Sequence, residues 1–241
     1  MKFEVAAGSD TGQVRRGNED AAVAIQSESR DAVLLVVADG VGGLAAGAHA
    51  SNLAVDRAVE AFRGCEGDPV DCLDASFRET SAMLYDEAGG DEARLSGTTV
   101  VALLLEPGRA TVLHAGDSRA YRIHEGALEL LTRDHSWVNE QVDAGLMSQD
   151  EAEVAPQRNI ITRCLGVEPG VEIERAELPP PAPGECYLLS SDGFHGVVPR
   201  AEVEKLLRSG KSVEEIAKQC IDVANRLGGP DNISVALARI G

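Results

Sequence analysis

VLLVVADGVGG (residues 33–43) decides the fold, because an apolar run ends there in an acid and a glycine-rich turn. A short apolar run bounded by turn residues predicts a buried strand. Such a strand would carry Asp39 to the edge of a sheet, where glycines let the backbone approach a ligand and leave the Gly40 carbonyl unhindered. Asp-Gly after a strand is also an ordinary hairpin turn, so this stretch alone does not distinguish a ligand site from a turn.

The same arrangement recurs along the chain, because five segments each present an acid beside an apolar strand. Clustered carboxylates cannot all ionise without compensation, so their convergence would imply bound cations. Ligation by oxygen alone indicates Mg²⁺ or Mn²⁺ rather than zinc. Two such ions can activate water for in-line displacement at phosphorus, which predicts a metal-dependent phosphatase. The acids are Glu19, Asp20, Asp39, Asp117, Asp192 and Asp231.

A phosphate dianion entering an acidic site also needs a donor, and Arg15 lies only a few residues before the first acids. The planar guanidinium binds phosphate through paired hydrogen bonds. We expect this role for Arg15 and a surface position for its neighbour Arg16.

Short runs rich in Val, Leu and Ile predict strands, and apolar residues at three- and four-residue steps predict helices. Several strands between about Gly97 and Leu131 follow one another through short breaks and predict an antiparallel meander. Two helices, a meander and two further helices favour antiparallel sheets covered by helices over a Rossmann-type sheet. The strands are expected at 31–38, 98–105, 110–114, 119–123, 186–189 and 233–238, and the helices at 44–62, 70–87, 201–208 and 213–227.

The chain has 241 residues, of which 44% are hydrophobic, and this is enough for one sizeable core. We expect a single phosphatase domain over residues 1–241. Residues 137–165 mix polar and apolar side chains and predict short helices in a mobile segment. The proline-rich stretch 178–184 is expected to be a stiff connector within the domain.

Forty acidic and 22 basic residues give a formal charge of −18, which disfavours nucleic acid and anionic lipid as partners. No run reaches the length of a membrane span, and the first ten residues lack a secretory signal, so a cytoplasmic location is expected. The five cysteines are odd in number and form no C-x-x-C pair, which indicates neither a disulfide framework nor a thiolate zinc site.

Eight segments, in this order, resemble the bacterial branch of the protein phosphatase 2C family, the metal-dependent Ser/Thr phosphatases. They extend over nearly the whole chain, and their order and spacing make the resemblance specific. The segments are TGQVRRGNED (11–20), ADGVGG (38–43), SGTT (96–99), GDSRAY (116–121), TRDHS (132–136), RNIITRCLG (158–166), SDG (191–193) and GGPDNISV (228–235).

The resemblance implies an α+β fold, a four-layer αββα sandwich of two antiparallel sheets flanked by helix pairs. It implies two or three Mn²⁺ or Mg²⁺ ions at one end of the sandwich and a flap at about residues 135–165. Arg15 would bind the phosphate. Asp39 would bridge two ions. The Gly40 carbonyl, Asp192 and Asp231 would complete the coordination of the first ion, and Glu19 and Asp20 would act on the second. Asp117 with Asp192 would hold a third, weaker ion.

The chain departs from the family at the general acid. Many members have a histidine just after the Asp-Gly pair or after the Gly-Gly, where this chain has Val41 and Leu44. Either water serves as the acid or another group substitutes, and His195, three residues after Asp192, is the candidate.

Three alternatives remain beside this interpretation. Cys72 and Arg78 have the Cys-x₅-Arg spacing of a cysteine phosphatase, but they fall in a predicted helix without glycine, so we treat the match as chance. An aspartyl phosphatase using Asp39 would want a second acid where Val41 stands. A non-catalytic phosphoprotein-binding member is the third alternative, although the expected ligands are present.

The resemblance implies hydrolysis of phosphoserine and phosphothreonine by activated water, without a phosphoenzyme. Expected partners are phosphorylated proteins, including a bacterial Ser/Thr kinase and its targets. The protein is expected to be a monomer.

Overall fold

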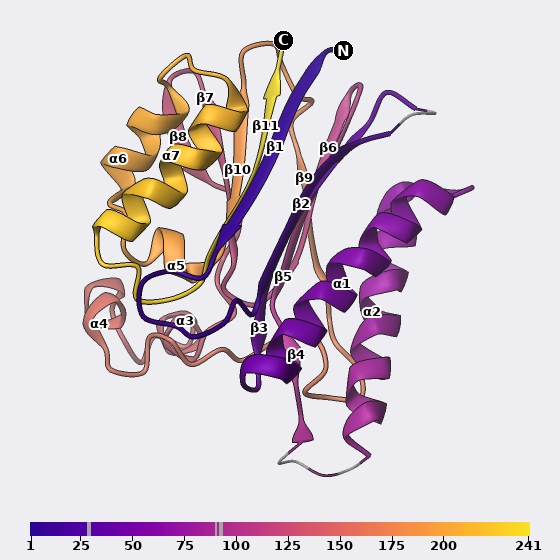
Figure 1. The fold of residues 1–241 in the computed structure, drawn as a ribbon, viewed down its shortest axis with the longest axis vertical. Coiled ribbons are helices and arrows are strands. Elements are labelled where there is room, and N and C mark those ends of the chain that lie inside the picture. The colour runs from indigo at the N-terminus through magenta and orange to yellow at the C-terminus, as the bar shows by residue number, and fades with distance from the viewer. Residues whose placement is uncertain (28–29, 90, 92–93) are drawn as a thin grey trace.

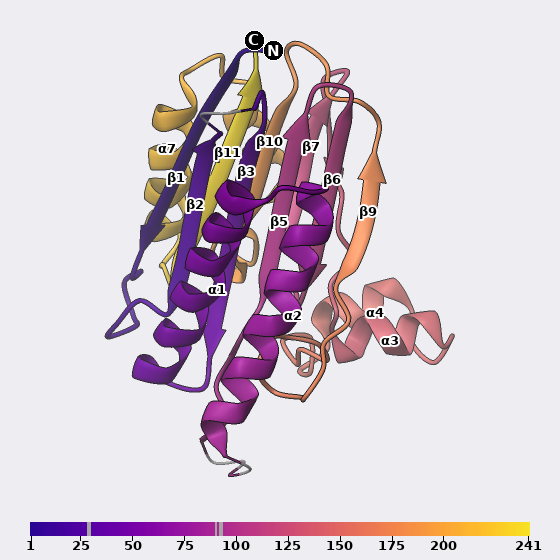
Figure 2. The ribbon, with the colours of Figure 1, turned by 90° about the vertical axis from the view of Figure 1, so that its right-hand side faces the viewer.

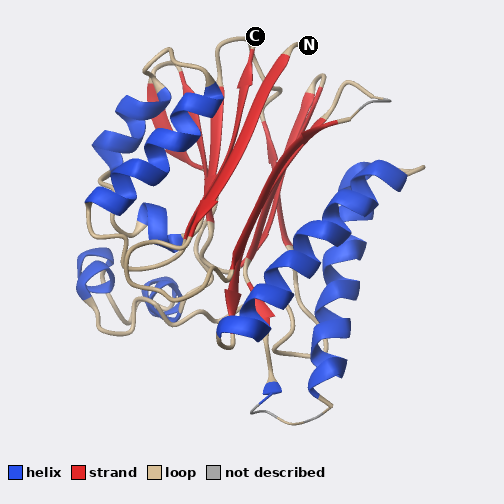
Figure 3. Cartoon of the chain, in the orientation of Figure 1, coloured by secondary structure: helices blue, strands red, loops and turns tan. Residues whose placement is uncertain are grey.

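The computed structural model describes all of residues 1–241 except 28–29, 90 and 92–93. Two antiparallel sheets pack face to face, and a pair of helices covers the outer face of each sheet (Figure 1; Figure 3). The expected α+β class and four-layer αββα sandwich are therefore confirmed. No helix among the described residues is both long and apolar enough to cross a membrane.

The first sheet has the strand order β1-β11-β10-β7-β8 and pairs the two ends of the chain. Its strands are β1 (Phe3–Asp10), β7 (Arg119–His124), β8 (Ala127–Leu130), β10 (Cys186–Ser190) and β11 (Ile233–Ile240).

The second sheet has the strand order β2-β3-β5-β6-β9, with the short β4 paired to the end of β3. Its strands are β2 (Asp20–Gln26), β3 (Val33–Val41), β4 (Gly97–Thr98), β5 (Val100–Glu106), β6 (Arg109–Ala115) and β9 (Glu174–Leu178).

Helices α1 and α2 lie on the second sheet, and α6 and α7 lie on the first, as the two perpendicular views show (Figure 2). The short helices α3 and α4 lie within residues 135–165, the segment that the sequence predicts as a flap, and one residue separates α5 from the end of β10. The bounds are α1 (Leu44–Gly64), α2 (Pro69–Ala88), α3 (Trp137–Asp143), α4 (Gln149–Val154), α5 (Asp192–His195), α6 (Arg200–Leu207) and α7 (Val213–Arg226).

Strand β3 is apolar throughout because both of its faces are buried. Leu34 and Val36 pack under α1 and α2, whereas Leu35 and Val37 face the layer between the two sheets. Successive side chains of a strand point to opposite faces. The same alternation places Asp39 on the face of Leu35 and Val37, at the end of the inter-sheet layer.

The expected single meander between Gly97 and Leu131 is wrong in one respect, because its strands belong to two sheets. Strands β5 and β6 form a hairpin in the second sheet, and β7 and β8 form one in the first. The chain crosses between the sheets at Gly116–Ser118. This crossing lies between the sheets at the end where β3 delivers Asp39.

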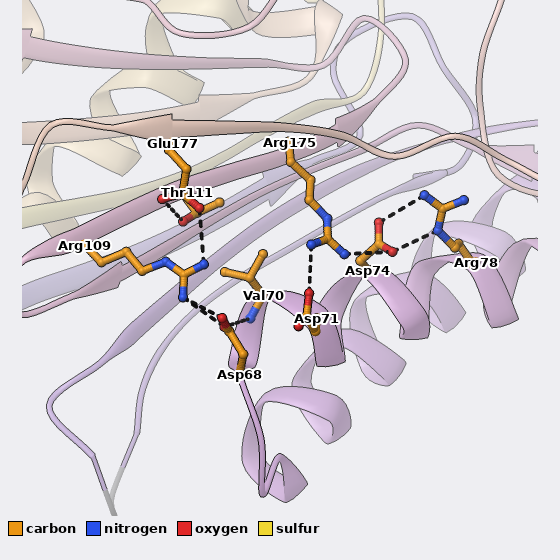
Figure 4. Close-up of polar contacts among 9 residues, drawn as sticks. All are labelled: Asp68, Val70, Asp71, Asp74, Arg78, Arg109, Thr111, Arg175 and Glu177. Carbon is orange, nitrogen blue, oxygen red and sulfur yellow. Dashed lines mark hydrogen bonds and ion pairs between the residues drawn. The ribbon is translucent and has the colours of Figure 1, made fainter.

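Helix α2 is tied to the edge strand β9 by a chain of ion pairs (Figure 4). Arg175 on β9 pairs with Asp71 and Asp74, at 2.8 and 2.9 Å. Arg109 on β6 pairs with Asp68, the residue that caps the helix. Much of the charge at this surface is therefore paired, and the pairs hold the helix against the otherwise open edge of the second sheet.

The absence of a disulfide, expected from the cysteine count, is wrong for one pair. Cys65 and Cys72 form a disulfide between the end of α1 and the first turn of α2. Cys164, Cys186 and Cys220 are free and buried. Cys72 is thus a helical, bonded residue, which supports treating its spacing to Arg78 as chance.

Candidate metal and phosphate site

Asp20 and Asp39 stand directly opposite each other on the antiparallel pair β2–β3. Ala22 and Ala24, which share a strand face with Asp20, pack into the layer between the sheets. Both carboxylates therefore face the end of that layer. Like charges directly opposite in a sheet are destabilising, so this register calls for compensating positive charge.

The first sheet contributes two further acids from neighbouring strands. Asp192 begins α5, separated from β10 by one residue, and Asp231 lies two residues before β11. Since β10 and β11 are antiparallel neighbours, the end of one lies beside the start of the other. Asp117 joins them from the crossing between the sheets.

The acids lie close enough to raise one another's pKa. Burial, followed by Asp20, Asp192, Asp117 and Asp231 in that order, raises the pKa of Asp39 well above its usual range. Burial also raises the pKa of Asp20 and that of Asp117 to about 7 each, with Asp192 adding to both. The four acids that act on Asp39 come from separate segments, so folding brings the sequence-predicted residues together.

The carboxylate of Asp20 provides a test of whether cations fit this site. Both of its oxygens are buried, and neither makes a hydrogen bond of normal geometry. The hydroxyls of Ser191 and Ser234 lie near enough to favour its charged form, but burial outweighs them. Buried carboxylate oxygens without donors are ready ligands for a hard cation, and an all-oxygen donor set suits Mg²⁺ or Mn²⁺. The residues present therefore fit the cations expected from the sequence.

Arg15 lies beside the carboxylate cluster, where it pairs with Asp231. Its Nη2 is 2.7 Å from Asp231 Oδ2, and half of its side-chain surface remains exposed. One guanidinium cannot neutralise this many acids. It does place a phosphate-binding group beside the carboxylates.

Gly40 and Glu19 are part of the same close packing. A Cβ on Gly40 would collide with the Gly47 carbonyl and would lie 2.6 Å from the Glu19 carbonyl oxygen. The Gly40 N–H donates to that carbonyl at 3.1 Å. Only glycine allows the start of α1 to approach the end of β3 in this way.

Asn232 and Thr99 support the site through hydrogen bonds. Both lie within the sequence motifs, but the motifs alone did not predict these supporting roles. The Asn232 side chain accepts from the Glu19 N–H and donates to the Thr11 and Gly17 carbonyls, so it ties the N-terminal loop to β11. Thr99 Oγ1 accepts from the Asp39 N–H and contacts Ser118 Oγ at 2.8 Å. Uncharged Thr and Asn beside an acid carry little signal in a single sequence.

A cavity of about 680 Å³ opens from the carboxylates toward the flap. One wall is formed by Asp117, Asp192 and Asp231, and side chains from α3, α4 and the segment after α4 form another. Those flap side chains are Val138, Asn139, Gln149, Ala152, Glu153, Arg158 and Asn159. The cavity is large enough to admit a phosphorylated side chain with part of its peptide.

His195 also lines this cavity, at the end of α5. Its Nδ1 lies 3.1 Å from Ser190 Oγ. Burial, with a smaller contribution from Arg119, lowers its pKa well below the usual value. A neutral imidazole at pH 7 has no acidic proton to spare, which argues against His195 as the general acid.

The chain is similar in sequence and in fold to known serine/threonine phosphatases. The family model for protein phosphatase 2C matches residues 9–232. A serine/threonine phosphatase of Listeria innocua is 34% identical over 95% of this chain and 92% of its own length. The solved serine/threonine phosphatase of S. agalactiae has a TM-score of 0.92 at 30% identity, with both chains fully covered.

The solved catalytic domain of the serine/threonine phosphatase PstP, in complex with two manganese ions, is also similar. Its TM-score is 0.82 at 33% identity, and 99% of each chain is covered. The family model, the similar sequences and structures, and the convergent acids all indicate the same family. The chain therefore belongs to the protein phosphatase 2C family.

Proposed function

We propose that the convergent acids hold two or three Mn²⁺ or Mg²⁺ ions and that the protein hydrolyses phosphoserine and phosphothreonine in other proteins. The observation that carries this proposal is the meeting of Asp20, Asp39, Asp117, Asp192 and Asp231 in one cluster, in which the pKa values of the first four are raised. The manganese ions of the PstP catalytic domain support it.

Asp39, Asp192 and Asp231, with the Gly40 carbonyl, would hold the first ion. Glu19 and Asp20 would act on a second, and Asp117 with Asp192 on a third. When bound, such cations supply positive charge that lowers the pKa of water and stabilises the negative charge on the phosphoryl oxygens in the transition state.

Arg15 would orient the phosphoryl group. Its guanidinium can exchange the Asp231 contact for a phosphate oxygen, because half of the Arg15 side chain is exposed and Asp231 lines the cavity. The leaving hydroxyl needs a proton, and the lowered pKa of His195 gives no support to that histidine as its source. In this proposal a water molecule in the cavity supplies the proton.

The substrate class is supported by the relatives, whose names state serine/threonine phosphatase, and by a cavity open to a peptide chain. A bacterial Ser/Thr kinase and its targets are the proposed partners. The protein is proposed to act as a monomer in the cytoplasm, in one domain with residues 135–165 as its flap.

Asp39→Asn tests the proposal. Hydrolysis of p-nitrophenyl phosphate and of a phosphothreonine peptide by the wild type should require Mn²⁺ or Mg²⁺ and stop with EDTA. The variant should lose about a thousandfold in kcat, because it removes the negative charge of a carboxylate that would hold the ions. Asp31→Asn is the matched control and should retain activity, because Asp31 is an exposed acid that precedes β3, at the opposite end of that strand from Asp39.

If the folded wild type, loaded with Mn²⁺ or Mg²⁺, hydrolysed no phosphopeptide, this result would contradict the proposed hydrolytic activity. Retained phosphopeptide binding in that case would favour the non-catalytic alternative.

A further inference from the structure

His114, His135 and Glu174 form a cluster beside the carboxylate site whose donor types could hold a metal ion. One possible ligand atom from each lies within 4.8 Å of the others. His114 is buried, and its Nδ1 has no hydrogen-bond partner. Imidazole and carboxylate together are a common ligand set for zinc.

The ring geometry excludes one ion shared by the two histidines. The imidazoles are stacked, with centroids 4.6 Å apart and planes inclined by only 9°. An ion lies near the plane of each imidazole that binds it, and two nearly parallel, stacked planes do not meet at one point. The cluster therefore has another role.

The hydrogen bond from the Gly116 N–H assigns the tautomer of His135 and reveals that role. The Gly116 N–H can only donate, so His135 Nδ1 accepts from it at 3.0 Å. A neutral ring then carries its hydrogen on Nε2, which donates to Glu174 Oε2 at 3.0 Å, although Nε2 also lies 3.0 Å from Arg163 Nη1, a donor that competes for this nitrogen. A metal at Nε2 would force that hydrogen onto Nδ1, against the Gly116 N–H.

His135 makes two hydrogen bonds with Gly116. Besides the ring contact, the His135 N–H donates to the Gly116 carbonyl at 3.0 Å. Gly116 has φ +117°, and a Cβ there would lie 2.6 Å from Thr99, so the turn before Asp117 accepts only glycine. On the other side of Asp117, Arg119 makes a two-bond ion pair with Asp134, the neighbour of His135.

The base of the flap lies on the opposite side of His135. The His135 carbonyl accepts from the Thr162 N–H, and Ser136 forms a β-bridge with Ile161. The flap has a small apolar core of its own, centred on Val138 and Ala152. The flap and the Asp117 loop therefore share His135 as their common anchor.

We propose that His135 is a positioning residue that fixes the Gly116–Asp117 peptide and thereby sets the affinity of the Asp117 carboxylate for its cation. Through its carbonyl contact to Thr162, it also couples that affinity to the position of the flap. The inference rests on the proposed function, since it takes Asp117 as a ligand of the weaker ion.

Two substitutions separate the contacts of the ring. Asn places an oxygen where Nδ1 stands and keeps an acceptor for Gly116, whereas Gln places its amide near Nε2 and keeps only the Glu174 side. Calorimetric titration with Mn²⁺ alone should show the weak class of sites weakened about tenfold in His135→Gln, a factor equivalent to one lost hydrogen bond. His135→Asn should stay within about twofold, and the strong class should be unchanged in both.

Asp117→Asn completes the design. It should abolish the weak class, and His135→Gln should then have no further effect on Mn²⁺ binding in the double variant. His49→Gln, on an exposed histidine of α1, is the control and should match the wild type. Equal losses in the Asn and Gln variants, or a weak class retained in His135→Gln, would overturn the positioning role.

The Asp117 variant also separates this inference from the proposed function. If Asp117→Asn keeps the weak class, the assignment of the ligand fails. If it loses the weak class and His135→Gln does not, only the inference fails.

A measurement on the unsubstituted protein guards against a variant that does not fold. In ¹⁵N-edited spectra, His135 should show a protonated Nε2 and an unprotonated Nδ1. During titration with Mg²⁺, its ring signals and the Gly116 amide should shift together in the weak phase. Independent shifts, or the opposite tautomer, would refute the coupling.

Discussion

Asp20 and Asp39 repel each other across one rung of the β2–β3 ladder, with Asp192 and Asp231 acting on both. The sequence places each acid at the end of an apolar run, so the identity of the acids was predictable. Their direct opposition was not, because it depends on the register of β2, whose half-buried residues give a weak strand signal. The support from Asn232 and Thr99 depends on contacts distant in sequence and was also missed.

Arg15 offers a prediction at the scale of one side chain. Arg15→Ala should raise KM for p-nitrophenyl phosphate about tenfold or more, because charge-assisted hydrogen bonds to phosphate are lost, and should change kcat much less. Steady-state kinetics with Mn²⁺ held at saturation would measure both constants. Arg16→Ala is the matched control, and an unchanged KM in Arg15→Ala would refute the phosphate-binding role.

Among the elements, buried strands and long amphipathic helices were predictable, and strands at sheet edges were not. Strand β3 is apolar on both faces, and α7 has apolar residues at helical spacing, so both were expected within a few residues of their bounds. Strands β1 and β9 are partly exposed edge strands, and β9 reads Glu-Arg-Ala-Glu-Leu. Their pairing comes from the neighbouring strand, which a single sequence does not reveal.

The disulfide between α1 and α2 should stabilise the folded protein. Cys65 and Cys72 are seven residues apart, and closing so short a loop should contribute about 2.5 kcal/mol to the free energy of unfolding. Cys72→Ser should lose that amount relative to the oxidised wild type in denaturant titrations. In the presence of a reductant the two proteins should be nearly equal. Five free thiols in the unreduced wild type would contradict the disulfide.

For the whole molecule, the acid cluster makes folding and ion binding interdependent. The folded chain raises the pKa of Asp117 from 3.8 to about 7. Folded protein therefore binds more protons than unfolded protein between these pH values. The Asp117 shift therefore predicts that stability in a chelator is highest at about pH 4 and below, and falls as the pH rises through 7.

This pH dependence can be measured by urea unfolding in EDTA. The shift of Asp117 alone corresponds to a loss on the order of 4 kcal/mol between pH 4 and pH 8. Saturating Mn²⁺ should reverse the trend, and Asp39→Asn should be more stable than the wild type in EDTA at pH 8. Stability that rises with pH in EDTA would show that the acids do not repel one another in the folded chain.

The two chain ends lie side by side at the pole of the sandwich farthest from α3, α4 and α5, where the Gly241 N–H donates to the Lys2 carbonyl (Figure 1). A linker attached to either end therefore emerges away from the cavity. Immobilising the protein on a bead or sensor chip through one terminus should leave the catalytic entrance open to a full-sized folded phosphoprotein.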